Sequence, residues 1–317
     1  MTKVSIRPEL HEAVKWQAAR VDQLLRAAGV VLRLPSPVVE VRDGRLDAAG
    51  VRLLVKRDDL IHPEMPGNKW RKLKHNLVTA ASQGHDTLLT FGGAYSNHIR
   101  ATAAAGHLFG FRTIGIIRGE EHLPLNDSLE CAAGQGMVLS YLDRATYRKK
   151  HTSEVAGALR EDWGSFYLLP EGGSNAFAVL GCAELPGEID EDFTIICCPV
   201  GTGGTLAGVA AGLRSGQEAI GFAVLKGGEF LTDEVSRLQT EAFGRASGNW
   251  RLEHAYHFGG FAKSTPELRY FIDDFEARHG LVLDWVYVAK MMFGIFDMVA
   301  GGRFPRGATI LAIVTGF

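Results

Sequence analysis

Residues 65–73 read Met65-Pro66-Gly67-Asn68-Lys69-Trp70-Arg71-Lys72-Leu73, a Pro-Gly turn followed by the start of an amphipathic segment. Apolar residues recur at helical spacing from Trp70 onward, which predicts a helix with Asn68 as its N-cap and Gly84 as its C-cap. Lys69 would then lie in the first helical turn, where the helix dipole disfavours a cation. If its pKa is lowered there, the amine becomes a nucleophile able to form a Schiff base. A solvent-exposed surface lysine is the alternative interpretation.

The composition favours a globular protein that acts on small molecules. The chain has 317 residues, long enough for two domains, and 34 Lys and Arg against 36 Asp and Glu, so it offers no basic surface for nucleic acid. No apolar run is long enough to span a membrane and the N-terminal residues lack a signal core, so we expect a cytoplasmic protein. The four cysteines have no Cys-x-x-Cys spacing, which argues against a disulfide framework or a zinc site.

Short apolar runs alternate with helical segments along most of the chain, which predicts an α/β fold with parallel sheets. Two such units of unequal size should leave a cleft between the carboxyl ends of their strands, where ligands of these sheets bind. The expected strands are 38–42, 51–56, 87–91, 112–117, 136–142, 165–170, 194–200, 219–225, 281–286 and 309–315. The expected helices, besides the one that follows Gly67, are 8–29, 96–109, 153–163, 205–214, 266–279 and 290–300.

A glycine-rich turn, Gly201-Thr202-Gly203-Gly204-Thr205, joins an expected strand to an expected helix. Such a turn presents backbone N–H groups and a helix N-terminus to an anion such as a phosphate. It lacks the Gly-Lys-Ser/Thr ending of a nucleoside-triphosphate loop. A dinucleotide fold requires an acidic residue at the end of the next strand, but Glu218 precedes that strand and Lys226 follows it, which weakens this interpretation. A glycine turn without any ligand is a further alternative.

Three other groups combine turn glycines with polar side chains. Gly92-Gly93-Ala94-Tyr95-Ser96-Asn97-His98 follows a strand, so Ser96 could serve only as a helix cap, whereas the Asn97 amide could donate to a phenolic oxygen. Gly172-Gly173-Ser174-Asn175 lies where the chain should recross between the two units. Tyr287 follows the expected strand 281–286, where its phenol would point into the same cleft. Packing alone would also account for a tyrosine at a strand end.

These motifs, in this order, resemble the pyridoxal-phosphate enzymes of the 1-aminocyclopropane-1-carboxylate deaminase and D-cysteine desulfhydrase family. The resemblance runs from about Pro35 to the C-terminus and includes Lys56-Arg57-Asp58-Asp59 and Asp284-Trp285-Val286-Tyr287. It implies fold type II, the tryptophan synthase β-like fold, with two domains, parallel or mixed sheets flanked by helices, and pyridoxal 5'-phosphate in the interdomain cleft. We expect a large domain of residues 1–72 and 171–317 and a small domain of residues 73–170. A homodimer is implied as well.

The resemblance also implies residue roles. Lys69 would form the Schiff base and accept the α-proton, Asn97 would contact the phenolic oxygen of the cofactor, and Gly201, Thr202, Gly203, Gly204 and Thr205 would hold its phosphate. Ser96 and Tyr287 correspond to hydroxyls on the substrate side, with Ser96 near the substrate carboxylate. The reaction implied is β-elimination or ring opening of a small amino acid, giving a 2-oxo acid and ammonia.

One position departs from the pattern of the family. Val288 stands where the deaminases have glutamate and the desulfhydrases commonly have threonine, and valine cannot hydrogen-bond the pyridine nitrogen. Thr315 corresponds to a C-terminal threonine of the desulfhydrases and could do so. We therefore expect D-cysteine desulfhydrase activity, with 1-aminocyclopropane-1-carboxylate deaminase activity as the alternative. An NAD(P) oxidoreductase and a ligand-binding protein without catalysis are more distant alternatives.

Overall fold

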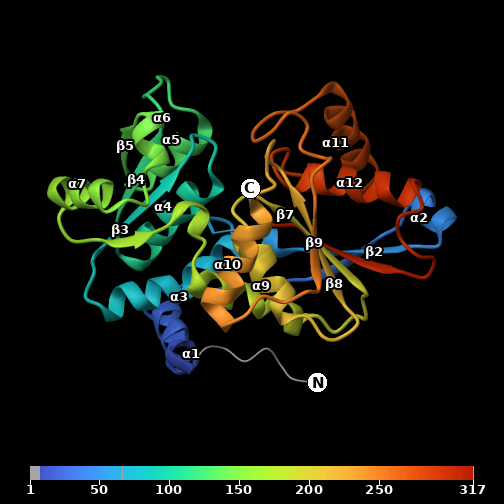
Figure 1. Cartoon of the computed structure of the whole chain (residues 1–317), viewed down its shortest axis with the longest axis horizontal. Coiled ribbons are helices and arrows are strands. Elements are labelled where there is room, and N and C mark those ends of the chain that lie inside the picture. Colours follow the sequence, from blue (N-terminus) through green and yellow to red (C-terminus); the bar gives the residue numbers. More distant parts are fainter. Residues whose placement is uncertain (1–7, 66, 317) are drawn as a thin grey trace.

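The computed structural model describes residues 8–65 and 67–316, and it contains two β-sheets that lie side by side (Figure 1). In the six-stranded sheet, β1 pairs antiparallel with β2 and the other neighbours pair parallel. This sheet has the order β1 (Val38–Val41), β2 (Arg52–Lys56), β10 (Thr309–Ile313), β7 (Ile195–Val200), β8 (Glu218–Ala223), β9 (Trp250–Glu253). The four-stranded sheet is parallel throughout, with the order β5 (Val138–Leu142), β4 (Arg112–Arg118), β3 (Thr87–Gly92), β6 (Tyr167–Leu169).

Helices cover both faces of the six-stranded sheet. Alternate residues of its strands point to opposite faces, and each set packs in its own apolar cluster with a different group of helices. Leu53, Cys197 and Ile310 pack in one cluster with residues of α11 (Pro266–His279) and α12 (Val288–Ala300). Leu54, Ile196 and Leu311 pack in the other with residues of α8 (Ala176–Ala183), α9 (Gly204–Gly212) and α10 (Leu231–Phe243). The other helices are α1 (Pro8–Ala28), α2 (Gly44–Ala49), α3 (Asn68–Ser82), α4 (Asn97–Phe109), α5 (Asp127–Gly134), α6 (Arg144–Arg148) and α7 (Ser153–Trp163). Short 3-10 turns are η1 (Asp58–Leu60), η2 (Glu171–Gly173) and η3 (Leu185–Glu188).

The predicted α/β fold with parallel or mixed sheets flanked by helices is confirmed. The strand predicted at 281–286 is wrong: Leu281 and Leu283 are buried in the core around α11 and α12, but no strand pairs with them in the described chain. The expectation that Asn68 caps α3 is also wrong, because Gly67 occupies the cap and Asn68 is the first helical residue. The helix ends at Ser82 with Gln83 as its cap, and Gly84 follows in the left-handed conformation.

Helix α3 is fixed at its start by a buried ion-pair network. Arg71, only 1% exposed, donates to both carboxylate oxygens of Asp58 at 2.7 and 2.9 Å and pairs with Glu188 at 2.7 Å. The backbone carbonyl of Asp58 accepts from Gly67 N at 2.8 Å, just before the helix. Moving Arg71 away from Asp58 and Glu188 would leave buried charges unpaired, which is costly. These contacts therefore hold the start of α3, which carries Lys69, in one position.

Candidate active site

A small cavity of about 50 Å³ lies where loops from the two sheets converge. Every predicted site residue except Gly204 lines this cavity. Lys72 and His98 line it as well. Most of these residues follow the carboxyl ends of parallel strands, the usual place for a ligand in sheets of this kind. The predicted site residues that line this cavity are Lys69, Ser96, Asn97, Gly201, Thr202, Gly203, Thr205, Tyr287 and Thr315.

Lys69 occupies the second helical position of α3, and its amine faces this cavity rather than bulk solvent. Burial, followed by the charge of Lys72, lowers the pKa of Lys69 from 10.5 to about 7. The Lys69 Nζ donates to Asn68 Oδ1 at 3.0 Å, and Asn68 Nδ2 donates to Thr205 Oγ1 at 2.8 Å. Asn68 therefore joins the lysine to the glycine-rich turn, and the lysine is well placed to act as a nucleophile and base near neutral pH.

The glycine-rich turn surrounds the N-terminus of α9 with almost no space for side chains. A Cβ at Gly204 would lie 2.6 Å from Ser174 Oγ and 3.2 Å from Lys72 Nζ, and one at Gly201 would lie 3.2 Å from the Tyr287 ring. Gly203 has a φ of +80°, and a Cβ there would point at Val235 of α10, so this glycine serves the backbone conformation and helix packing. Without side chains on these glycines, the backbone N–H groups at the start of α9 are accessible from the cavity, which suits a bound phosphate.

Lys72 is a site residue that the sequence analysis missed. Its side chain is 3% exposed, and its Nζ donates to the Gly172 carbonyl at 2.8 Å and to Ser174 Oγ at 3.0 Å. Ser174 Oγ in turn lies 2.6 Å from Thr202 Oγ1. Burial lowers the pKa of Lys72 to about 8. The spacing of three residues from Lys69, which places two helical side chains on one face, was the signal that could have identified it.

Ser96 and Asn97 begin α4 directly behind the end of β3. Ser96 Oγ accepts from Ile99 N at 3.4 Å, so this serine is a helix cap, as the simpler interpretation holds, and it also lines the cavity. A Cβ at Gly92 would lie 2.9 Å from Ser96 Oγ, which explains the glycine before this turn. The α4 N-terminus therefore offers a second position where an anion would be stabilised by helix N–H groups.

Tyr287 enters from the opposite side, immediately before α12, although the segment that precedes it is not a strand. Burial and the neighbouring Asp284 raise the pKa of the Tyr287 phenol well above its usual value, so it stays neutral and can donate a hydrogen bond. Burial likewise raises the pKa of Asp284 to about 6, and its Oδ2 has no hydrogen-bond partner within the described chain. Asp284 and Lys69 interact electrostatically, and the sequence analysis gave Asp284 no role.

Thr315 and Val288 differ sharply in their surroundings. Gly67, with a φ of +63°, approaches the end of the chain so closely that a Cβ there would lie 1.6 Å from the Thr315 carbonyl oxygen. Thr315 thus lies beside the start of α3 and lines the small cavity. Val288 has no exposed surface and packs in the core with Ile295 and Val314. Of these two residues, Thr315 alone lines the cavity.

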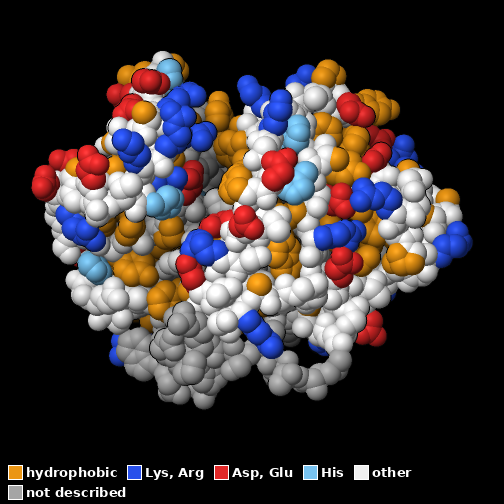
Figure 2. Space-filling model, in the orientation of Figure 1, with side chains coloured by type: hydrophobic (Ala, Val, Ile, Leu, Met, Phe, Trp, Pro, Cys, Tyr) orange, Lys and Arg blue, Asp and Glu red, His pale blue; other side chains and the backbone are white. Residues whose placement is uncertain are grey.

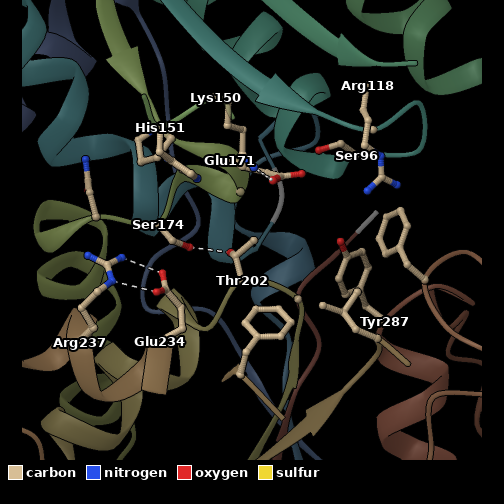
Figure 3. A pocket seen from close by; sticks show the side chains of 18 of the residues that line it. Ser96, Arg118, Lys150, His151, Glu171, Ser174, Thr202, Glu234, Arg237 and Tyr287 are labelled. Carbon is tan, nitrogen blue, oxygen red and sulfur yellow. Dashed lines mark hydrogen bonds and ion pairs between the residues drawn. The ribbon is translucent and has the colours of Figure 1, made fainter. Parts of the chain in front are cut away.

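A wider cavity of about 650 Å³ opens from the small one and shares Ser96, Gly172, Gly201, Thr202 and Tyr287 with it. In Figure 2 the hollow between the two halves is visible, with lysine and arginine side chains gathered on the side of α6. Figure 3 shows Ser96 and Arg118 on one wall and Tyr287 on another. A small buried cavity that opens into a wider polar one can hold a cofactor and admit a substrate.

Comparison with known proteins gives the family. The family described as "Pyridoxal-phosphate dependent enzyme" matches residues 32–316, so this chain belongs to the pyridoxal-phosphate-dependent enzymes. A Pyrococcus furiosus protein, provisionally named 1-aminocyclopropane-1-carboxylate deaminase, is 34% identical over 84% of this chain and 85% of its own length. The D-cysteine desulfhydrase of Klebsiella pneumoniae is 28% identical over 85% of this chain and 88% of its own length. A crystal structure of an ACC deaminase homologue superposes with a TM-score of 0.80, at 29% identity, over 92% of this chain and 94% of that one.

The predicted family, fold type II and pyridoxal 5'-phosphate cofactor are confirmed, and so is the class, a pyridoxal-phosphate-dependent lyase or deaminase. The interpretation as a nicotinamide enzyme is thereby set aside. The site agrees with this cofactor, since a lysine of lowered pKa faces a cavity whose other side is a glycine turn too tight for any Cβ at Gly204. Within the described residues, no helix is long and apolar enough to cross a bilayer.

Proposed function

We propose that this chain eliminates the β-substituent of a small D-amino acid, as in the conversion of D-cysteine and water to pyruvate, ammonia and hydrogen sulfide. The relatives named D-cysteine desulfhydrase and bifunctional D-cysteine desulfhydrase/1-aminocyclopropane-1-carboxylate deaminase support both this activity and ring opening of the cyclopropane as the second candidate. We also propose, on the same family resemblance, the division into residues 1–72 with 171–317 and residues 73–170, a cytoplasmic homodimer, and the site roles that follow.

The observation that carries the choice of substrate is the cavity wall near Thr315. The small cavity has no Asp or Glu among the described residues that line it, and Val288 lies outside that lining. A hydroxyl partner such as Thr315 would leave a pyridine nitrogen largely unprotonated, whereas a carboxylate would favour its charged form. Weaker withdrawal of electrons suits the loss of a good leaving group such as sulfide. It suits less well the opening of an unactivated ring.

Pyridoxal 5'-phosphate, when bound, supplies the electron sink that stabilises negative charge at the substrate α-carbon. Lys69 would hold the cofactor covalently and accept the α-proton, which its pKa of about 7 permits near neutral pH. The turn from Gly201 to Thr205, with Lys72 beside it, would bind the phosphate. Asn97 would donate to the phenolic oxygen of the cofactor. Ser96, at the α4 N-terminus, would bind the substrate carboxylate.

Tyr287 would serve as the proton donor on the substrate side. Its neutral phenol lies across the cavity from Ser96 and beside Phe261, whose ring centroid is 5.8 Å from that of Tyr287. A phenol kept protonated by burial can donate to a departing sulfur without first taking up a proton. A Tyr287→Phe variant should therefore lower kcat more than it raises KM.

Two measurements on the purified holoenzyme test the proposal. Borohydride reduction and peptide mapping should place the pyridoxyl group on Lys69, and label on a different lysine would refute that assignment. Steady-state assays should then give a higher kcat/KM for D-cysteine than for 1-aminocyclopropane-1-carboxylate. Faster turnover of the cyclopropane would overturn the choice of substrate while leaving the cofactor site intact.

A further inference from the structure

The wider cavity carries charged side chains that the proposed reaction with D-cysteine does not use. Its lining includes three fixed cations, Arg118, Lys150 and Arg237, and three carboxylates, Glu171, Glu234 and Glu241. Its volume of about 650 Å³ falls within the range of about 300–1,000 Å³ typical of sites that enclose a ligand larger than a three-carbon amino acid. Which of these charges is free to meet a ligand follows from their pairing.

Each carboxylate in this lining already has a cationic partner. Glu171 pairs with Lys150 at 3.1 Å and also accepts from the Tyr147 hydroxyl at 3.0 Å. Glu234 pairs with Arg237 at 2.7 Å, and Glu241 pairs with the same guanidinium. The charges of Lys150 and Arg237 are therefore already balanced by carboxylates of the protein (Figure 3).

Arg118 is the exception among the described cations of this lining. Its guanidinium makes no hydrogen bond or ion pair with any described residue, although arginine stays charged at every physiological pH. A planar guanidinium with its donors unused can bind a carboxylate, sulfonate or phosphate in a bidentate manner. Arg118 is therefore the charge in this cavity that is available to a ligand.

The position of Arg118 places that charge beyond the proposed carboxylate site. Arg118 is the last residue of β4, next to the end of β3, and its Nη2 lies 3.9 Å from where a Cβ of Gly93 would be. Arg118 and Ser96 both line the wider cavity, and Figure 3 shows their side chains on the same wall. Since Ser96 and the α4 N-terminus already provide for the α-carboxylate, Arg118 is placed for a second acid group of the substrate.

We propose that Arg118 binds an anionic group on the β-substituent, so that the preferred substrates are amino acids with a second acid group. This inference rests on the proposed elimination and specifies the class of its substrate. The bond changes of the reaction are the same as for D-cysteine. Arg118 would add selectivity for substrates whose leaving group carries a negative charge, because a pocket without a cation would not favour that charge.

A pair of compounds that differ only in charge tests this inference. S-carboxymethylcysteine and its neutral amide, S-carbamoylmethylcysteine, are compared as D- and L-enantiomers with wild-type holoenzyme and an Arg118→Gln variant. Arg112→Gln, at the exposed opposite end of the same strand, is the matched control. Both kcat/KM and, by calorimetry, the Kd of each compound are measured. Arg118→Gln should reduce the preference for the acid over the amide about tenfold or more, as expected for a hydrogen bond between charged groups, and Arg112→Gln should not.

The other outcomes separate the alternatives. An equal loss for acid and amide in Arg118→Gln would mean that the guanidinium binds the α-carboxylate, which would overturn the inference. An unchanged preference would overturn it as well. If no amino acid is turned over by the wild type, the proposed elimination fails, but the ratio of Kd values still decides whether Arg118 recognises the second acid group.

Discussion

Replacing Lys69 by methionine, which has similar length and no charge, should stabilise the cofactor-free protein in a pH-dependent way. Burial and Lys72 lower the pKa of Lys69 from 10.5 to about 7. Between these two pH values the unfolded chain carries a proton on this amine that the folded chain has lost, so the free energy of unfolding rises with pH. The penalty of the lysine is therefore fully present below about pH 7 and disappears above the pKa of the unfolded chain.

The size of the effect follows from the shift. Since one pKa unit corresponds to about 1.4 kcal/mol, the ceiling is about 5 kcal/mol at and below neutral pH. The Lys69 side chain is partly exposed to the cavity, and screening by water there reduces the expected gain from Lys69→Met to about 2–3 kcal/mol at pH 7. Near pH 10.5 the gain should be under about 0.5 kcal/mol, because the folded amine is then neutral and the amine of the unfolded chain is only half protonated.

Urea unfolding of the cofactor-free protein at about pH 7 and about pH 10.5 measures this difference. Lys149→Met is the control, since Lys149 is an exposed residue directly after α6 and should show little dependence on pH. A gain from Lys69→Met that is the same at both pH values, or a loss at neutral pH, would refute the view that burial of the amine is costly. The same variant should bind the cofactor weakly and lose exchange of the α-proton.

Three further substitutions test the remaining parts of the site. Gly204→Ala should lower cofactor occupancy with the fold retained, because its Cβ would lie 2.6 Å from Ser174 Oγ, whereas Gly134→Ala in α5, with open space around it, should not; cofactor absorbance after dialysis measures both. Lys72→Met should weaken cofactor affinity about tenfold or more through loss of a charge-assisted contact, and unchanged affinity would remove Lys72 from the phosphate site. Thr315→Val should lower kcat more than it changes substrate affinity, while Thr315→Ser should retain activity; wild-type kinetics in the valine variant would exclude this hydroxyl as the ring partner.

The sequence predicted those parts of the site that are local in the chain. The Pro-Gly turn before Lys69 leads directly into the start of α3, and the glycine run 201–205 contains the strand end, the turn and the helix start that define an anion site within a few residues. The strand predicted at 281–286 failed because the buried Leu281 and Leu283 pack in the core with residues of α11 and α12, with no neighbouring strand in the described chain. A short apolar run indicates a buried segment but not a hydrogen-bonded partner strand.

Local sequence patterns could not predict which residues line the wider cavity. Arg118 lies about twenty residues from the nearest motif, and only the pairing of β3 with β4, with Gly92 opposite Ile117, brings it beside Gly93. Phe261 enters the cavity from a loop that follows β9, a strand that the sequence analysis did not predict. Strand order decides such neighbours, and hydrophobic periodicity carries no information about strand order.

The electrostatics of the site explain why a phosphate-bearing cofactor completes it. Two neighbouring amines, Lys69 and Lys72, are held largely out of water with lowered pKa values, and in the described chain neither has a carboxylate within ion-pair distance. Asp284 acts on Lys69 only at longer range, and burial raises its own pKa to about 6. A phosphate at the Gly201–Thr205 turn would supply the counter-charge for Lys72, and a covalent bond to Lys69 would replace its free amine. Because both changes remove a desolvation cost of the folded state, cofactor binding should stabilise the fold beyond the contacts that it adds.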